Sequence, residues 1–348
     1  MTFKTLFARI PVDRFLLLLM GTVAIAALLP ARGEVAAAFD WITFAAIALL
    51  FFLYGARLSP GAVWQGLKHW RLQGLILAST FVLFPLIGLL FRPLAADLLP
   101  PELALGLLYV CLLPSTVQSS IAFTSIAGGN VPAAFTSASV SNLLGIVATP
   151  LLVLALASGS GNLSFGLDPV LKIAGQILAP FLAGQLARPL VGNWLARHRP
   201  VTSVVDRGSI LLVVYAAFSE GVVSGVWTSV GAAELALVVL ADVVILFLAL
   251  ALTTLASRRL GFAREDEIAI VFCGSKKSMA TGIPMAGILF PGHTVALVVL
   301  PLMLFHQIQL FACAVIAQNY AKAAMPPEAR LSPEAAAETV REAAEKEA

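Results

Sequence analysis

The chain has 348 residues, of which 59% are hydrophobic and only 12% are charged, and its mean hydropathy is +0.94. Soluble domains carry about 25% charged residues, so this chain lacks the polar shell that a large soluble α/β enzyme needs. The net charge of +3 includes no basic cluster of the kind that binds nucleic acid. The composition predicts an α-helical protein that crosses the lipid bilayer many times.

Ten apolar segments, each near the ~20 residues that span a bilayer, follow one another along the chain, with Gly, Pro and charge between them. They cover residues 14–30, 38–56, 72–95, 102–127, 131–157, 168–192, 205–227, 232–256, 265–290 and 294–321. We interpret the first as a transmembrane helix and not a signal peptide, because it lacks an A-x-A cleavage site. The last 27 residues, 322–348, form a charged tail rich in Ala and Glu.

The distribution of positive charge supports this count. With both termini in the cytoplasm, 17 of the 22 Lys and Arg residues fall on the inner side and 3 on the outer side. The remaining two, Lys276 and Lys277, lie within the membrane. Cytoplasmic loops carry the excess of Lys and Arg, and one miscounted span would destroy the asymmetry downstream. We therefore expect a multi-pass protein of the cell (inner) membrane with both termini cytoplasmic.

The ten segments divide into five plus five around a Gly/Ser-rich loop, residues 158–169. An odd number of helices per half inverts the second half relative to the first. The fourth segment of each half is interrupted, at Pro114 and at Gly274, and such corresponding breaks point to a transporter binding site. The predicted fold is an all-α membrane protein of ten transmembrane helices in two inverted five-helix repeats, with helices 4 and 9 discontinuous.

The first break lies in CLLPSTVQSSIAFTSIAGGN, residues 111–130. Pro114 removes one helical hydrogen bond, and freed carbonyls and hydroxyls at this depth suit a cation, whereas the start of the resumed helix suits an anion. The polar candidates that follow the proline are Ser115, Thr116, Gln118, Ser119, Ser120 and Thr124. A lone Ser or Thr usually bonds its own helix backbone, and this alternative stays open for each of them.

The second break lies in VFCGSKKSMATGIP, residues 271–284, where two lysines lie between apolar runs with no acid beside them. A charged side chain at bilayer depth is costly and commonly functional. The candidates here are Ser275, Lys276, Lys277, Ser278 and Thr281. A cytoplasmic loop is the alternative, but an extra loop would invert the last span and place the charged tail outside.

Three further polar residues lie within spans: Thr80 in the third, Glu220 in the outer part of the seventh and Asp242 near the middle of the eighth. An unpaired carboxylate at mid-membrane would cost several kcal/mol, so we expect Asp242 to have a partner. For Glu220 a position at the membrane interface remains the alternative.

The sequence gives little support to an enzymatic function. Ser275 beside Lys276 could suggest a hydrolase dyad, but adjacent helical residues point about 100° apart. No nucleotide-binding motif appears, and Cys111, Cys273 and Cys313 are expected to be buried free thiols. We expect a protein that is not an enzyme.

The broken helices with LLPSTVQSSIAF, AGGN and FCGSKKSMATGIPMA resemble the bile acid:sodium symporter family, in particular its bacterial and vertebrate branch of uncertain substrate. The resemblance covers about residues 10–320. It implies that residues 1–321 form one ten-helix transporter unit, with a panel domain of helices 1, 2, 6 and 7 and a core domain of helices 3–5 and 8–10. The discontinuous helices 4 and 9 would cross in the core. A small amphipathic organic anion would enter the crevice between them, and residues 322–348 would form a cytoplasmic tail.

The family's sodium ligands are matched here only in part. Its fourth-helix Ser-Asn pair falls at Ser119 and Ser120, which are therefore the candidate sodium ligands. Its other ligand positions differ here: a third-helix glutamine falls at Thr80, two hydroxyl ligands at Ala134 and Ala138, a glutamate shared between both sodium sites at Phe272, and a later glutamine at Lys276. Ser137 and Asn142, near the two alanines, are also candidates for the site.

We predict a secondary transporter of an organic anion that works by alternating access, with a sodium ion or a proton as coupling ion and no other cofactor. A membrane regulator of ion homeostasis that no longer transports is the alternative. A fixed ammonium at Lys276 or Lys277 would supply the charge that a sodium ion supplies in the family. We expect this lysine to pair with Asp242, to carry the coupling proton, and to make transport independent of sodium.

Overall fold

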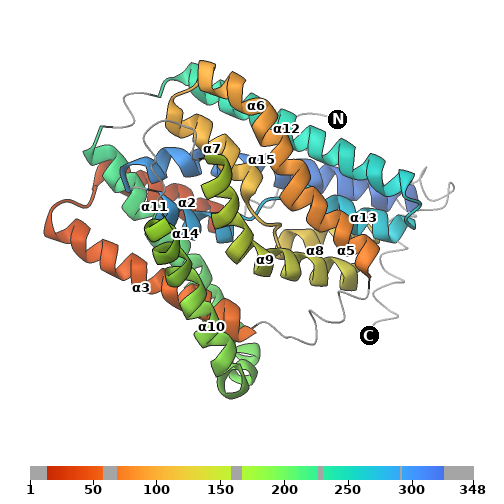
Figure 1. Ribbon diagram of the computed structural model, residues 1–348, viewed down its shortest axis with the longest axis horizontal. Coiled ribbons are helices and arrows are strands. Elements are labelled where there is room, and N and C mark those ends of the chain that lie inside the picture. Colours follow the sequence, from red (N-terminus) through yellow and green to blue (C-terminus); the bar gives the residue numbers. More distant parts are fainter. Residues whose placement is uncertain (1–13, 58–68, 158–166, 226–229, 291, 325–348) are drawn as a thin grey trace, which may run out of the picture.

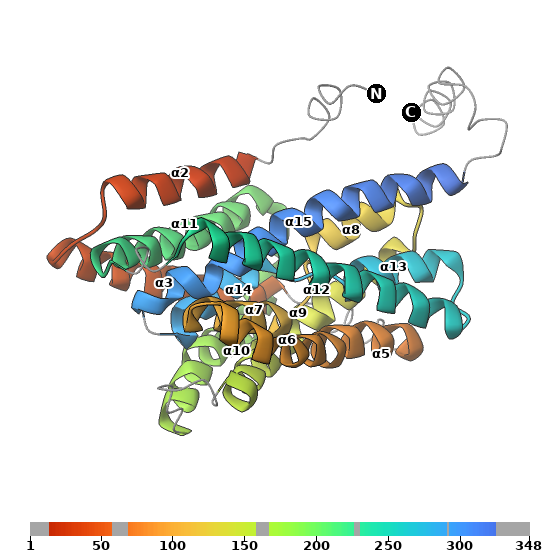
Figure 2. The same cartoon turned by 90° about the horizontal axis from the view of Figure 1, so that it is seen from above.

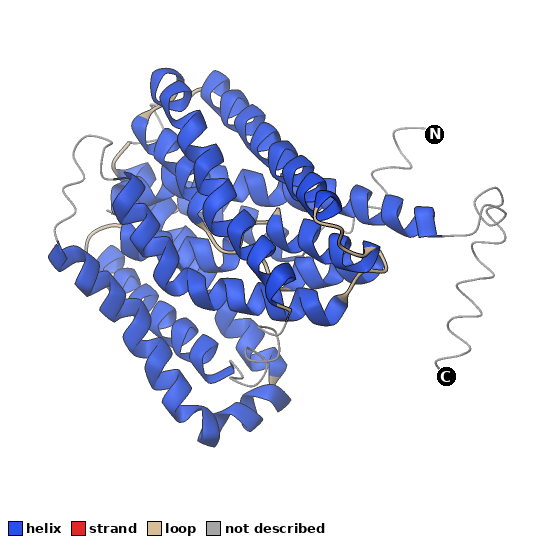
Figure 3. Cartoon of the chain, turned by 45° about the vertical axis from the view of Figure 1, so that its right-hand side comes forward, coloured by secondary structure: helices blue, strands red, loops and turns tan. Residues whose placement is uncertain are grey.

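The computed structural model describes residues 14–57, 69–157, 167–225, 230–290 and 292–324, and within these ranges it consists of helices joined by loops, with no strand (Figure 3). The helices are α2 (Arg14–Leu28), α3 (Glu34–Arg57), α5 (Trp70–Ala78), η1 (Ser79–Leu83), α6 (Phe84–Leu98), α7 (Pro101–Leu112), α8 (Gln118–Ile126), α9 (Val131–Ala157), α10 (Leu167–Arg197), α11 (Arg199–Val223), α12 (Ala232–Arg259), α13 (Arg264–Gly274), α14 (Met279–Leu289) and α15 (Gly292–Ala324).

Every one of the ten predicted apolar segments is occupied by a described helix or by a pair of helices with a break. Among the described residues, six helical stretches are long and apolar enough to cross a membrane, and α2 and α7 contain shorter apolar stretches. The protein is therefore a multi-pass membrane protein. The inverted five-helix repeat stays a prediction, and most of the Gly/Ser-rich loop and of the tail lies outside the described residues.

The two predicted helix breaks are both present. α7 ends at Leu112 and α8 begins at Gln118, so the first break surrounds Pro114. α13 ends at Gly274, and α14 begins after Ser278, whose hydroxyl caps the new helix by accepting a hydrogen bond from the amide of Thr281 at 3.2 Å. Serine is a favoured N-cap because its oxygen satisfies a free amide at the helix start.

The third segment differs from the uninterrupted helix that we predicted over residues 72–95. A five-residue π turn, η1, separates α5 from α6, and it closes with a bond from the amide of Phe84 to the carbonyl of Ser79. Pro85 follows directly and has no backbone N–H to donate, so the regular hydrogen-bond pattern of the α-helix is interrupted here. Single π turns inside α-helices are frequent at functional sites, and this one contains Thr80.

The helices α2, α3, α10 and α11 pack on one another, and α3 runs beside α10 at the lower left of Figure 1. Two glycines allow the backbones of α3 and α10 to approach closely. A Cβ added to Gly55 would collide with the carbonyl of Phe181, and one added to Gly184 with the carbonyl of Phe52. Small residues have this role in membrane helix packing generally.

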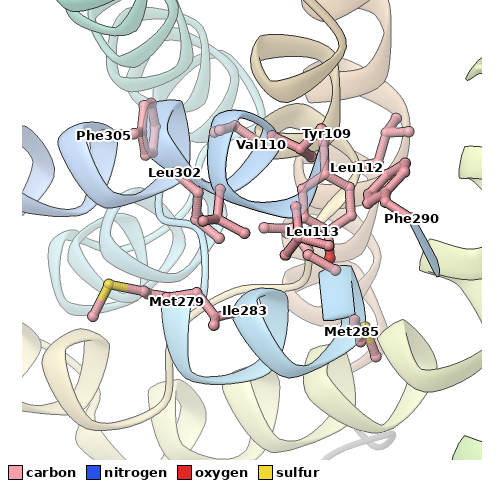
Figure 4. Close-up of a cluster of buried hydrophobic side chains, with 14 of the residues drawn as sticks. Tyr109, Val110, Leu112, Leu113, Met279, Ile283, Met285, Phe290, Leu302 and Phe305 are labelled. Atoms are coloured by element: carbon pink, nitrogen blue, oxygen red, sulfur yellow. The ribbon is translucent and has the colours of Figure 1, made fainter. Parts of the chain in front are cut away.

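The remaining helices surround the two breaks, with α12 running across α7, α13 and α15 in the view of Figure 2. Their apolar interior is illustrated in Figure 4, where side chains of α7, α14 and α15 meet. Tyr109 of α7 is fully buried and packs edge-on against Phe290, with ring centroids 5.1 Å apart. Its hydroxyl donates to the carbonyl of Gly282 at 2.7 Å, so this residue fastens α7 to α14 beside the second break.

Candidate functional site

The two helix breaks lie against each other and satisfy each other's free polar groups. The amide of Ser278 donates to the carbonyl of Pro114 at 2.9 Å. In return, the hydroxyl of Ser115 donates to the carbonyl of Cys273 at 2.6 Å, and that of Ser120 to the carbonyl of Phe272 at 3.0 Å. A broken helix inside a membrane needs such partners for its freed backbone groups. The family resemblance, and not the residue pattern by itself, implied this crossing of helices 4 and 9.

Lys277 is fully buried, and its ammonium is held by three main-chain carbonyls. Its Nζ donates to the carbonyls of Leu113 at 2.7 Å, Thr80 at 2.9 Å and Cys111 at 3.0 Å. The ring of Phe84 lies 4.0 Å from the same nitrogen. An ammonium has three donors, so all of them are used. The carbonyls come from the π turn and from the break at Pro114, two places where the helix ladder is interrupted.

Gln309 of α15 fixes the main chain of Lys277. Its side-chain oxygen accepts from the amide of Lys277 at 2.9 Å, and its Nε2 donates to the carbonyl of Lys277, also at 2.9 Å. Nε2 also lies 2.9 Å from Nδ1 of His306. Our sequence analysis did not single out Gln309. The available signal was a pair of amides, Gln307 and Gln309, in the apolar middle of the tenth segment, where an unpaired buried amide would be costly.

Lys276 is also fully buried, but its ammonium has a different environment. Its Nζ lies 3.4 Å from the hydroxyl of Ser119, a long distance for a hydrogen bond. Two aromatic rings cover it, with the centroid of Phe123 at 4.4 Å and that of Phe272 at 5.5 Å. Cation–π contacts of this kind gain in strength when the cation is removed from water. Lys276 is thus held mainly by rings and Lys277 mainly by carbonyls.

A network of hydroxyl and amide groups surrounds the crossing. Thr116 lies between Ser119 and Ser120, with hydroxyl–hydroxyl distances of 2.8 and 2.9 Å. Asn142 of α9 donates to the carbonyl of Ser115 at 2.6 Å and accepts from the hydroxyl of Thr281 at 2.7 Å. The sequence-predicted residues that the structure brings together are Thr80, Ser115, Thr116, Ser119, Ser120, Asn142, Lys276, Lys277, Ser278 and Thr281.

Five other candidates do not join this network. Ser137, Thr124 and Ser275 donate to carbonyls of their own helices, at 2.8, 2.7 and 2.5 Å, which is the ordinary role of hydroxyls in apolar helices. Gln118 is exposed. Glu220 is exposed as well, and its carboxylate lies against Gly292 at the start of α15, where an added Cβ would collide with it.

The predicted ion pair between Asp242 and a lysine of the second break is wrong. Asp242 is fully buried in α12, but neither carboxylate oxygen has a hydrogen-bond partner among the described residues. Lys277 uses its donors on carbonyls instead, and Lys276 lies among rings. Consecutive helices and similar depth suggested the pair, but neither fixes the direction in which a side chain points. The freed carbonyls, which sequence cannot place, took the role expected of the acid.

The positions at which the resemblance implied sodium ligands offer few side-chain oxygens in this chain. Ser119 and Ser120 are present, but the ammonium of Lys276 already lies beside Ser119. Phe272 and Ala134 supply no side-chain oxygen where the resemblance implied ligands. Two fixed ammonium groups would also repel an added cation.

Comparison with known proteins gives the family. A model of the SBF-like CPA transporter family matches residues 13–322, which is most of the chain. The chain belongs to this family. The family resemblance inferred from the two break motifs is thereby confirmed, and the protein belongs to a family of transporters.

Relatives match over most of their own length. The chain is 56% identical over 310 residues to "Uncharacterized protein PA2026" of Pseudomonas aeruginosa, covering 89% of this chain and 93% of that protein. It is 51% identical over 311 residues to "Putative symporter YfeH" of Escherichia coli, covering 88% and 92%. It is 29% identical over 278 residues to sodium/bile acid cotransporter 7 of Rattus norvegicus, covering 79% and 82%.

Proposed function

We propose that this SBF-like protein is a secondary transporter of an amphipathic organic anion, and that Lys276 and Lys277 act as permanent cations in place of sodium ions. Transport would proceed by alternating access, with α2, α3, α10 and α11 as panel and the other helices as core. The observation that carries the proposal is the cradle of three carbonyls around the Lys277 ammonium. Unwound carbonyls of this kind coordinate the coupling cation in transporters with broken helices.

The positions of the two ammonium groups support the same reading. Lys277 reaches the carbonyl of Thr80, and Lys276 reaches the hydroxyl of Ser119. In the family that the chain resembles, these two positions carry a glutamine and a serine that bind sodium. Each lysine therefore contacts a residue at one of the family's sodium-ligand positions. Phe272 stands where the family has the glutamate that both sodium ions share. Compared with the family's site, this chain lacks that carboxylate and has two lysine ammonium groups in its place.

The charge balance favours an anionic substrate. Neither ammonium has an acid within salt-bridge distance among the described residues. Buried cations that are balanced only by carbonyl dipoles and rings raise the local potential and attract an anion. The rat relative is named a sodium/bile acid cotransporter, and the Escherichia coli relative is named as a symporter. A carboxylated or sulfonated amphiphile fits both the charge and the apolar surroundings.

The test is uptake of radiolabelled taurocholate, and of a panel of carboxylated and sulfated amphiphiles, into proteoliposomes. We expect gradient-dependent uptake of at least one of them, equal in sodium chloride and in choline chloride. Lys277→Gln should abolish this uptake, and Lys322→Gln, at the exposed end of α15, should not change it. Strict sodium dependence of the wild type would refute the replacement of sodium by lysine. Absence of uptake for every anion would refute the transport proposal.

A further inference from the structure

Asp242 is a buried carboxyl group that nothing in the described structure satisfies. Its side chain is fully buried, and neither carboxylate oxygen has a hydrogen-bond partner among the described residues. It lies on α12 eight residues after Glu234 and sixteen before Arg258, so about 12 and 24 Å along the helix from those charges. Both are at the ends of the apolar stretch. A buried acid within a membrane-spanning helix is by default a candidate functional site.

The groups around α12 leave Asp242 without a fixed countercharge. α12 packs against η1, α6, α7, α13 and α15. The titratable groups that the structure describes on these elements and at the breaks are Arg92, Asp97, Glu102, Tyr109, Cys111, Arg264, Glu265, Asp266, Glu267, Cys273, Lys276, Lys277, His306, Cys313, Tyr320 and Lys322. Two of these elements, η1 and α7, carry the carbonyls of Thr80 and Cys111 that accept from Lys277. The helix of Asp242 therefore borders the carbonyl cradle, although the acid itself does not enter it.

The surroundings suit a proton better than a metal ion. Hard cations such as calcium and magnesium are held by about six or more oxygen ligands, and no partner lies within hydrogen-bond distance of either Asp242 oxygen in the described chain. A proton needs only the carboxylate itself. An isolated buried carboxylate is so costly that the neutral acid is the form expected in such a setting.

We propose that Asp242 binds and releases the proton to which transport is coupled. The proposal rests on the proposed transport function and adds its coupling ion. In the conformation described, the side chain is the neutral acid, –COOH. When a rearrangement of the core brings water or the Lys277 ammonium to it, the group becomes –COO⁻ and H⁺ leaves to the accessible side. The two lysines stay protonated throughout, and the group whose charge changes during the cycle is Asp242.

The first experiment observes the proton directly and needs no substrate. Infrared spectra of the protein in lipid vesicles should show a protonated carboxyl band at neutral pH that shifts in deuterated water and disappears at high pH. Asp242→Asn should remove the band. Asp97→Asn, a matched change at an exposed position of α6, should leave it unchanged. If Asp242→Asn does not fold, carbon-13 labelling of the aspartate carboxyls in the wild type should shift the same band. Absence of a protonated aspartate band would overturn the proposal.

The second experiment asks whether this proton is used. In proteoliposomes that take up an anion, an inward proton gradient should accelerate wild-type uptake at least several-fold. Asp242→Asn should remove this acceleration but retain exchange of labelled for unlabelled anion across the membrane. Gradient-driven uptake by Asp242→Asn equal to that of the wild type would refute the coupling role. If no anion is transported at all, the proposed function fails, whereas the infrared result still decides whether Asp242 holds a proton.

Discussion

The two adjacent lysines have unlike surroundings, and this difference governs what each substitution should do. Lys277 has three carbonyl acceptors between 2.7 and 3.0 Å, whereas Lys276 has one long contact to a hydroxyl and two rings. Charge-assisted hydrogen bonds are the stronger ones, and a buried carbonyl that loses its donor keeps the full cost of desolvation. Lys277 should therefore contribute more to stability than its neighbour.

The first prediction concerns cation rescue at the carbonyl cradle. Lys277→Ala should lower the free energy of unfolding by about 3 kcal/mol, because three buried carbonyls lose their donor and a cavity remains. Sodium or methylammonium chloride should then restore thermal stability, since either cation can enter the vacated cradle. Lys322→Ala should respond to neither salt. A Lys277→Ala protein whose melting temperature is the same in sodium and choline chloride would contradict the idea that the cradle binds cations.

The second prediction concerns the positioning role of Gln309. Gln309→Leu removes both hydrogen bonds to the main chain of Lys277 and should cost about 2 kcal/mol of stability. Uptake per folded molecule should also fall, because the main chain of Lys277 in the second break is no longer held in place. Gln318→Leu changes an exposed amide of the same helix and serves as the control. Equal uptake by the two variants would show that Gln309 does not position the site.

At the scale of elements, the sequence predicted where the two helix breaks lie but not which groups surround the lysines of the second break. Proline and the crowded hydroxyls identified the interruption at Pro114, and the glycine with two lysines identified the one after Gly274. The π turn at Thr80 was not predictable, because a proline such as Pro85 in a largely apolar segment is compatible with a kink, a break or a π turn. Asp242 was expected to pair with a lysine, since sequence gives depth along a helix but not the direction of the side chain around it.

The third prediction tests the close approach of α3 and α10. Gly184→Ala would drive a methyl group into the carbonyl of Phe52, so the helices must separate, at a cost of about 1–3 kcal/mol. Gly175→Ala, on the same helix, meets no atom within 4 Å and should be neutral or slightly stabilising. The measurement is the melting temperature of each purified variant. Equal values for the two would show that the glycine contact is not needed for the packing of α3 on α10.

At the scale of the whole molecule, the contacts between loops agree with the topology that charge predicts. Arg71 donates to the carbonyl of Leu260, Asn130 to Asp266, and Arg264 to the carbonyl of Tyr320. All of these residues fall at segment ends that the distribution of Lys and Arg assigns to the inner face. At the other end, Arg92 donates to the carbonyl of Leu156. Four contacts thus join ends that the ten-segment count places together.

The last prediction fixes which end faces the cytoplasm. The three native cysteines are all buried, so a single introduced thiol can report exposure against a low background. Asp97→Cys lies at the end predicted to be outside and Arg259→Cys at the end predicted to be inside, and both positions are exposed. In intact bacterial spheroplasts, a membrane-impermeant maleimide should label Asp97→Cys and not Arg259→Cys, and permeabilisation should make both reactive. Labelling of Arg259→Cys alone would show that the orientation is the opposite of the predicted one, with most of the Lys and Arg residues outside, contrary to the positive-inside rule. Labelling of both in sealed cells would mean that one predicted segment between them does not cross the membrane.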